Sequence, residues 1–445
     1  GGGGGGGGGS SSGIDAATFT KLLGEHAWLT RAIVNDLTVP SWREFTKQVR
    51  RVYDAAEAVR GGANASYIPS LANVDPEQWG VSVCTRGGQV LSVGDTTELF
   101  CVQSMTKVVN YCLAHELTGE ATVLKHVGRE PSGRQFNELC LNAQNRPHNP
   151  CINAGAIMAC SLIKPELDAS GRFSLVMETW KRLTGGTPAQ FDNATFLSER
   201  DSADRNWTLA YMMKDAGAFP AGVDLKTTLE FYFMTCSILC TAKQCAVVVA
   251  TLANGGVQPL TGERIFSERT VRNVLSIMAT CGMYDYSGEW LFKVGLPAKS
   301  GVGGGIITAV PGVGGICSWS PRLDKVGNSA RGVAFFEQLC SVYSFHIYDA
   351  SQRSLKLQAT ARAGADQDDR TERLLRAAAG DDVAEVRRLV SAENVDVNVA
   401  DYDARTALHV AAANDATRTV RLLLELGADA QRVDRWGAKP AVPSS

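Results

Sequence analysis

Apolar residues near the start of the chain recur three and four positions apart, which is the spacing of one buried face of an α-helix. A second run with this spacing begins after Pro40-Ser41, where the Ser41 hydroxyl can cap the first turn. Residues 14–63 are therefore predicted as a helical section that ends at Gly61-Gly62. The two runs are Phe19, Leu22, Leu23, Leu29, Ile33 and Val34, and then Trp42, Phe45, Val49 and Val52.

Residues 64–350 mix the alternating pattern of strands with longer helical patterns. Two alternating segments flank Arg86-Gly87-Gly88, which is typical of a β-hairpin. A sheet built from both ends of this block, with helices from its middle, predicts an α/β domain with a helical insertion. Strands are expected at 79–83, 89–93, 305–310, 314–318 and 332–336, and helices at 104–117, 229–253 and 268–280.

The end of the chain repeats itself at an offset of 33 residues, which is the ankyrin period. The offset pairs Leu389 with Leu422 and Asp396 with Asp429, and Thr406–Ala411 resembles the ankyrin T-P-L-H-x-A turn with Ala407 in place of Pro. After a linker at 351–369, residues 370–445 are predicted as two all-α ankyrin repeats and the stub of a third. A plain helical hairpin is the alternative.

Composition changes this picture only at the N-terminus. Ten of the 45 Gly lie in residues 1–13, a Gly/Ser tail without side chains that could pack. The remainder is ordinary globular sequence, and its length allows about three domains. A net charge of −2 gives no basic field for nucleic acid or an anionic membrane. No apolar run of spanning length is present. The initial Gly and the lack of a signal pattern indicate a truncated or engineered start.

Twelve Cys lie between Cys84 and Cys340, mostly inside apolar runs. Disulfide frameworks belong mainly to small secreted chains, so these residues are predicted as reduced, buried thiols. No C-x-x-C spacing occurs, and a zinc site is not expected.

The candidate chemistry rests on Ser-x-x-Lys, which occurs at Ser104–Lys107 and at Ser161–Lys164. A serine hydroxyl needs a neighbouring base, and this spacing sets both side chains on one helical face. Chance matches are expected in a chain of this length. Pro165 stops the second helix just after Lys164, which indicates a helix C-terminus. Ser104 opens a helix, where the N-terminus stabilises negative charge, and is the better candidate.

A second motif supports Ser104. Lys299-Ser300-Gly301 precedes the Gly-rich start of a strand, Val302–Gly305. In serine β-lactamases and penicillin-binding proteins, a K-T-G or K-S-G strand flanks the S-x-x-K serine. A simple tight bend is the alternative, and a dinucleotide fingerprint fails because Ile306 stands where Gly is required.

Six segments in order resemble the serine-dependent glutaminases, which share the β-lactamase-like fold. With the helical start and the ankyrin repeats, the resemblance covers about residues 14–440 and is strongest to the animal kidney- and liver-type enzymes. Met105 and Thr106 inside the Ser-x-x-Lys motif depart from the family pattern. The segments are Phe100–Lys107, Arg146–Ala156, Ser198–Asn206, Phe231–Phe233, Gly282–Asp285 and Leu296–Val302.

The resemblance implies hydrolysis of L-glutamine to L-glutamate and ammonia through a γ-glutamyl-serine intermediate. Ser104 would be the nucleophile and Lys107 its base, with the N–H groups of Ser104 and Val302 as the oxyanion hole. Tyr232 and Tyr284 match the two family tyrosines near the nucleophile, and either could relay a proton. Considered alone, Tyr232 would more often be a core residue.

The resemblance also implies a pocket for a free amino acid. Glu199 would bind the α-ammonium, and Tyr67, Asn153 and Asn206 would bind the carboxylate and amide. Without the resemblance, Glu199 would be interpreted as a solvated surface charge.

The same resemblance implies no metal or cofactor, possible activation by inorganic phosphate, a homotetramer, and mitochondrial localisation with the cytoplasm as the alternative. The Phe136–Asn142 stretch resembles a family loop that couples activity to assembly. The ankyrin repeats are the expected site for a protein partner. Two other hypotheses stay open: an acyl-serine enzyme acting on β-lactams or peptides, and an ankyrin-type binding protein with an inactive enzyme domain.

Overall fold

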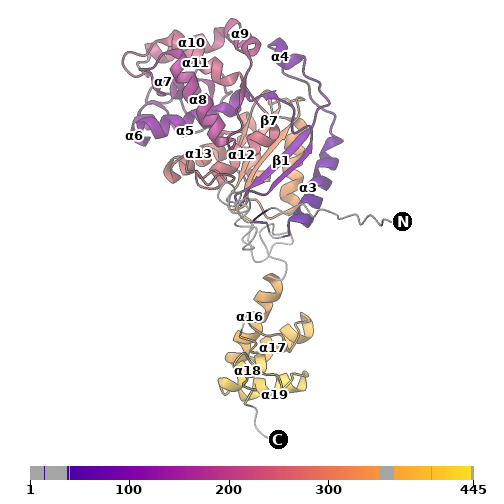
Figure 1. The fold of residues 1–445 in the computed structure, drawn as a ribbon. Helices are drawn as coiled ribbons and strands as arrows, with labels where there is room; N and C mark the ends of the chain where they lie inside the picture. Colours follow the sequence, from indigo (N-terminus) through magenta and orange to yellow (C-terminus); the bar gives the residue numbers. More distant parts are fainter. Residues whose placement is uncertain (1–14, 16–37, 40, 350–364, 402, 442–445) are drawn as a thin grey trace, which may run out of the picture. The chain divides into compact units, whose positions relative to one another are not determined.

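The computed structural model describes residues 15, 38–39, 41–349, 365–401 and 403–441, with the side chains of 365–369 and 372 excepted (Figure 1). The first predicted helical run and the Gly/Ser tail lie outside these residues. The chain forms two compact units, residues 1–360 and 361–445, and each is described by itself.

The centre of the first unit is a five-stranded antiparallel sheet whose strands come from both ends of the block, as the sequence predicted. The hairpin of β1 (Gly80–Thr85) and β2 (Val90–Gly94) pairs through β1 with β8 (Gly314–Trp319). Beyond β8 lie β7 (Gly305–Val310) and β6 (Ala298–Ser300). The order is β2-β1-β8-β7-β6, and Figure 1 shows β1 and β7 in this sheet.

Alternate residues of these strands face two different cores, which is the two-residue period of a sheet buried on both faces. Ile307 and Cys317 belong to one core with α12 (Ala242–Ala253). Ile306 and Ile316 belong to the other, together with residues of α3 (Trp42–Glu57) and α15 (Ala330–Val342). In Figure 1 α12 and α3 flank the sheet. Ser41 precedes α3 as predicted, but its side chain makes no capping hydrogen bond.

Two predicted elements are wrong. Residues 332–336, expected as a strand, lie in helix α15 because Ser329 caps its start and the buried residues beyond it, Leu339 and Cys340, continue a helical spacing. The single helix expected at 229–253 is three elements, α11 (Leu225–Cys236), β5 (Ile238–Cys240) and α12. Ser237 ends α11, and Thr241 with Gln244 forms a capping box that starts α12.

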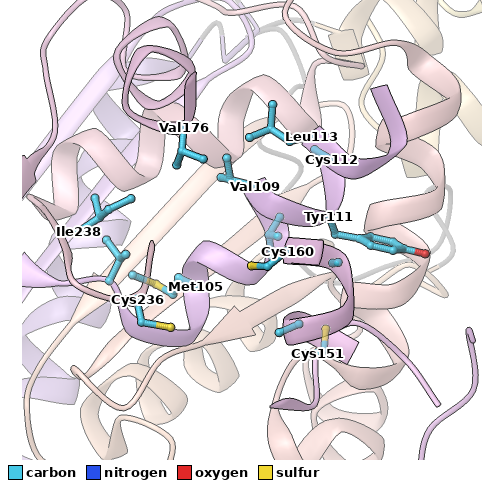
Figure 2. Close-up of a cluster of buried hydrophobic side chains, with 14 of the residues drawn as sticks. Met105, Val109, Tyr111, Cys112, Leu113, Cys151, Cys160, Val176, Cys236 and Ile238 are labelled. Carbon is cyan, nitrogen blue, oxygen red and sulfur yellow. The ribbon is translucent and has the colours of Figure 1, made fainter. Parts of the chain in front are cut away.

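Most of the remaining elements of this unit form the helical insertion, which has an apolar core, whereas Trp290 in the helix Ser287–Lys293 belongs to the core shared with α3 and α15. Figure 2 shows part of its core, where Met105 and Val109 meet Cys160, Val176 and Ile238. A small sheet within it has the order β3 (Phe100–Cys101), β5, β4 (Gln190–Phe191). The elements are α4 (Pro69–Ala72), β3 (Phe100–Cys101), α5 (Thr106–Thr118), α6 (Glu120–His126), α7 (Asn153–Ser161), α8 (Ala169–Leu183), β4 (Gln190–Phe191), α9 (Asn193–Asp201), α10 (Asp204–Asp215), α13 (Glu268–Cys281) and α14 (Ser287–Lys293).

The second unit is made of helices with a core of its own residues. Its helices are α16 (Ala365–Ala379), α17 (Val383–Arg387) with a π-helical continuation at Arg388–Ala392, α18 (Ala407–Ala413) and α19 (Thr417–Glu425). At the predicted ankyrin turn, Thr406 and His409 form a capping box in which the Thr406 Oγ1–His409 Nδ1 distance is 2.9 Å.

All twelve cysteines lie in the described residues, none of them is in a disulfide there, and ten of them are buried. In the part of the chain that the structure describes, no group of acidic, His and Cys side chains could hold a metal ion. No described helix combines the length and the apolar character that crossing a bilayer requires.

Candidate active site

Ser104 lies in a 3-10 turn, Gln103–Met105, between β3 and α5. Its side chain is only 8% exposed. The preceding residue, Gln103, has a φ of 47°, in the left-handed region that non-glycine residues rarely adopt. Strain of this kind costs roughly 1–3 kcal/mol and persists where surrounding contacts enforce it. The turn therefore holds the serine in a fixed, buried position at the start of α5.

Lys107 follows in the first turn of α5 and is 2% exposed. Its amine donates to the Cys151 carbonyl oxygen at 3.2 Å and to Asn153 Oδ1 at 2.7 Å. Burial lowers the pKa of Lys107 to about 8, because a low-dielectric interior disfavours the ammonium form. About a tenth of the amine is therefore neutral at pH 7, and the neutral form is the one that a general base requires.

Asn153, the first residue of α7, connects several of the sequence-predicted site residues. Its Oδ1 accepts from Lys107 and, at 3.4 Å, from the hydroxyl of Tyr232 on α11. Its Nδ2 donates to Asn206 Oδ1 on α10 at 3.0 Å. Three helices from distant parts of the sequence thus meet at one amide side chain.

Glu199, on α9, is 8% exposed and lies beside the nucleophile turn. Its Oε1 accepts from the Tyr67 hydroxyl at 2.7 Å and from Gln103 Nε2 at 2.9 Å. Oε2 has no hydrogen-bond partner among the described residues. Burial raises the pKa of this carboxyl group, while the donors of Tyr67 and Gln103 oppose the rise. A carboxylate with one oxygen held and one open suits a small cationic group.

Tyr284 approaches Ser104 from the other side of the site. Its φ is 54°, a second strained position. Burial raises its pKa, and the nearby Ser104 hydroxyl opposes that rise, although the Tyr284 hydroxyl makes no hydrogen bond of ordinary geometry in the described structure. Lys299 lies under the ring, with Nζ 4.6 Å from its centroid. Burial lowers the pKa of Lys299 to about 7.

Val302 lies in the tight turn between β6 and β7, which is pressed against the nucleophile segment. A Cβ atom on Gly301 would lie 2.7 Å from the Val102 carbonyl oxygen, and one on Gly303 would lie 2.2 Å from that of Cys101. Only glycine therefore permits this approach. The backbone N–H of Val302 makes no hydrogen bond within the described residues. It is thus free to donate to a ligand at Ser104.

A cavity of about 770 Å³ adjoins these residues and is lined by Tyr284, Cys151 and the 131–138 segment, which includes Phe136. The Phe136 ring lies 5.0 Å from that of Tyr284, between centroids, and its carbonyl accepts from the Asn153 N–H at 2.9 Å. The loop that the sequence singled out is thus in direct contact with the site.

The second Ser-x-x-Lys lies elsewhere. The Ser161 hydroxyl donates to the Met158 carbonyl oxygen at the end of α7, and Lys164 pairs with Glu166 at 3.2 Å. This is the helix terminus that the sequence predicted.

Comparison with known proteins identifies the family of the chain. The family model described as "Glutaminase" matches residues 62–348, and "Ankyrin repeats (3 copies)" matches residues 347–434. The chain belongs to the glutaminase family. It is therefore a hydrolase that acts on a linear amide, joined to ankyrin repeats.

Relatives of the glutaminase family match along most of the chain. Putative glutaminase 2 of Caenorhabditis elegans is 43% identical over 93% of this chain and 68% of its own length. The mitochondrial liver isoform of glutaminase from Rattus norvegicus is 43% identical over 96% of this chain and 71% of its own. Among solved structures, the probable glutaminase ybaS has a TM-score of 0.66 at 34% identity, covering 69% of this chain and 99% of that one. Mglu in its glutamate form has a TM-score of 0.65 at 39% identity, over 69% and 70% of the two chains.

Two residues of this site were not among those predicted from the sequence. Gln103 contacts both Glu199 and Tyr67, yet a Gln before a serine carries no signal in a sequence pattern. Lys299 belongs to the Lys-Ser-Gly motif, and that motif was the available signal for it.

Proposed function

We propose that this glutaminase hydrolyses L-glutamine to L-glutamate and ammonia through a γ-glutamyl-serine intermediate at Ser104. The observation that carries the proposal is the buried amine of Lys107, one helical turn from Ser104, with a pKa lowered to about 8. A neutral lysine is the base that a Ser–Lys nucleophile needs.

In the first step the Ser104 Oγ attacks the side-chain amide carbon of glutamine, and its proton passes to the Lys107 Nζ. The N–H groups of Ser104 and Val302 stabilise the resulting oxyanion. The C–N bond then breaks, and the leaving nitrogen takes a proton and departs as ammonia. Tyr284 relays that proton, a role supported by its closeness to Ser104, whereas the Tyr232 hydroxyl is engaged with Asn153.

In the second step water attacks the acyl-serine carbon, Lys107 accepts a proton from the water, and Ser104 leaves with a proton as L-glutamate is released. The free oxygen of Glu199 binds the α-ammonium group, while Tyr67 and Gln103 hold its other oxygen. Asn206 and Asn153 face the α-carboxylate and the amide. The fixed reach between Glu199 and Ser104 favours glutamine over the shorter asparagine.

A coupled glutamate assay with L-glutamine tests the mechanism. Ser104→Ala is expected to abolish ammonia release, and Lys107→Ala to be nearly as damaging, because nucleophile and base act as a unit. Lys164→Ala is the matched control from the second Ser-x-x-Lys and keeps wild-type activity. Full turnover by Ser104→Ala, in protein whose circular dichroism is native, would disprove the mechanism.

We further propose that the chain itself supplies nucleophile, base and oxyanion donors, so that the reaction needs no metal or cofactor. Undiminished activity after dialysis against a chelator tests this. Running the assay with and without inorganic phosphate tests activation by that anion.

We also propose a homotetramer in mitochondria, with the ankyrin repeats as the site for a protein partner. The mitochondrial liver isoforms among the relatives support the compartment. Light scattering on the purified chain tests the mass of the oligomer. Fractionation of cells tests the compartment, and a cytoplasmic location would contradict the proposal.

A further inference from the structure

A second cavity, of about 330 Å³, lies between α5, α6 and α13, outside the site described above. Its lining includes Tyr111, Arg129, Glu130 and Asn273, and none of the residues assigned to glutamine binding. It shares only Pro131 and Thr280 with the larger cavity beside Tyr284. The two cavities are therefore neighbours with separate linings.

Tyr111 gives this cavity a buried polar group without a partner. The residue is 2% exposed, and its ring meets that of His115 edge-on at 4.6 Å between centroids. Figure 2 shows its ring directed away from the other labelled core residues, with the hydroxyl at the outer end. That hydroxyl has no hydrogen-bond partner among the described residues, and it lines the cavity. The hydroxyl is therefore available to bond a ligand in the cavity.

The charged residues that line this cavity are of both signs, and Arg129 and Glu130 are exposed. Arg129 and Glu130 have no ion-pair partner within the described part of the chain, and the Asn273 amide has no hydrogen-bond partner there. Glu120, by contrast, is already paired with Arg269 at 3.6 Å. Arg129 is close enough to Tyr111 to lower its pKa, against the larger rise that burial causes. Donors for a carboxylate thus adjoin an acceptor for an ammonium group.

We propose that this cavity is a second binding site, which takes a small α-amino acid in its zwitterionic form. Arg129, Tyr111 and Asn273 would hold the carboxylate, and Glu130 the ammonium. A simple anion would meet repulsion from Glu130, so both charges are needed. The volume lies near the lower limit for ligand pockets, roughly 300 Å³, which limits the ligand to a small one.

Three hydrogen bonds connect this site to Lys107. The Glu130 carbonyl accepts from Asn149 Nδ2 at 2.9 Å, and Asn149 Oδ1 accepts from the Cys151 N–H at 2.9 Å. The Cys151 carbonyl in turn accepts from Lys107 Nζ at 3.2 Å. Asn149 is buried, so this chain of contacts is held within packed protein. A ligand on Glu130 therefore bears on the position of a group that binds the Lys107 amine.

Calorimetric titration of the full chain with L-alanine tests the site. Tyr111→Phe and Arg129→Ala are each expected to weaken binding about tenfold, since a tenfold loss is less than a hydrogen bond to a charged group typically contributes. Lys125→Ala removes an exposed cation of α6 that does not line the cavity, and is the matched control. Propionate, which lacks the ammonium group, is expected to bind at least about tenfold more weakly than L-alanine.

Three results would overturn the site. Unchanged binding in both Tyr111→Phe and Arg129→Ala would do so, as would a loss of L-alanine binding in Glu199→Gln, which would assign the binding to the active site. The third result is tighter binding of inorganic phosphate than of L-alanine in a displacement titration. It would indicate a site for a simple anion.

The connection to Lys107 is tested by separate measurements. It rests on the proposed role of Lys107 as the base, whereas binding at the second site does not. Saturating L-alanine is expected to slow hydrogen exchange at 128–131 and 147–151 in the wild type but not in Arg129→Ala. It is also expected to shift the pH at which kcat rises. A pH profile that L-alanine leaves unchanged, with binding intact, would refute the connection alone.

Discussion

The catalytic proposal depends on the environment of a single amine. Lys107 is bonded to two neutral oxygens, which by themselves favour an ammonium group, yet burial outweighs them and lowers its pKa to about 8. Its hydrogen-bond partners among the described residues include no carboxylate. The Asn153 side chain is therefore the point at which the charge state of Lys107 can be altered with the least change in shape.

The first prediction concerns pH. Because the neutral amine is the active form, kcat/KM is expected to rise about tenfold per pH unit below about pH 8 and to level off above it. Asn153→Asp adds a negative charge beside Nζ, favours the ammonium, and is expected to move this rise upward by at least about one pH unit. Lys164→Ala should leave the profile unchanged. A profile that does not move in Asn153→Asp would indicate that another group titrates.

The second prediction concerns the Tyr67 hydroxyl, which donates to Glu199. Hydrogen bonds to charged groups contribute about 1.5–3 kcal/mol, and about 1.4 kcal/mol corresponds to tenfold. Tyr67→Phe is therefore expected to raise KM for L-glutamine about tenfold or more with a much smaller change in kcat. Tyr211→Phe, on an exposed tyrosine of α10, is the control. A fall in kcat at unchanged KM would contradict a binding role.

At this scale the sequence alone predicted only what is local. Ser104 and Lys107 are three residues apart, so their spacing is visible in a pattern. Glu199 meets Tyr67 across 132 positions, and Asn206 meets Asn153 across 53. Those assignments needed the family resemblance, because no local rule brings such residues together.

At the scale of elements, the site is assembled where short segments touch through glycine. The β6–β7 turn rests against β3 and the nucleophile turn at distances that exclude a side chain at Gly301 and Gly303. The elements wrongly predicted, 332–336 and 229–253, contain apolar runs that suit helix and strand equally. Their caps decided the outcome, and the capping hydrogen bonds of Ser329 and Thr241 are visible only in the folded chain.

The third prediction follows from that contact. Gly303→Ala places a methyl group 2.2 Å from the Cys101 carbonyl oxygen, so the turn must move away from Ser104. Overpacking of this kind typically costs about 1–3 kcal/mol, and the displaced Val302 N–H is expected to lower kcat/KM at least about a hundredfold. Gly61→Ala, where nothing lies within 4 Å of the added Cβ, is the control. Unaltered kinetics would show that the turn does not serve the site.

At the scale of the whole molecule, Glu77 joins parts of the first unit that are far apart in sequence. Its carboxylate accepts from Arg322 at 2.6 Å and from Arg331 at 2.8 Å, and Arg331 also donates to the Val59 carbonyl oxygen. The strand order depends on the same union of the two ends of the block. The sequence pattern predicted that strands from both ends of the block share one sheet. It did not predict the contacts of Arg322 and Arg331 that stabilise this arrangement.

The fourth prediction concerns acid stability. The guanidinium groups of Arg322 and Arg331 lower the pKa of Glu77 to about 2. A lowered carboxyl pKa contributes stability above its ordinary value of 4.5, and this is lost as pH falls toward 2. Glu77→Gln is therefore expected to lower the Tm of the first unit at pH 7. The difference in Tm between this variant and the wild type is expected to be smaller at pH 3. Glu98→Gln removes an exposed carboxylate and is the control, and it should leave the Tm unchanged at both pH values. A Tm difference of the same size at both pH values would contradict the link between the ionisation of Glu77 and stability.

The strained backbone at Gln103 and Tyr284 has a consequence for engineering. Selection for heat resistance favours substitutions that relieve strained backbone conformations. Two of the strained residues, Gln103 and Tyr284, lie on either side of Ser104. A glycine at either position would remove strain together with a side chain that lies at the site. Thermostable variants obtained without an activity screen are therefore expected to include inactive ones altered at these two positions.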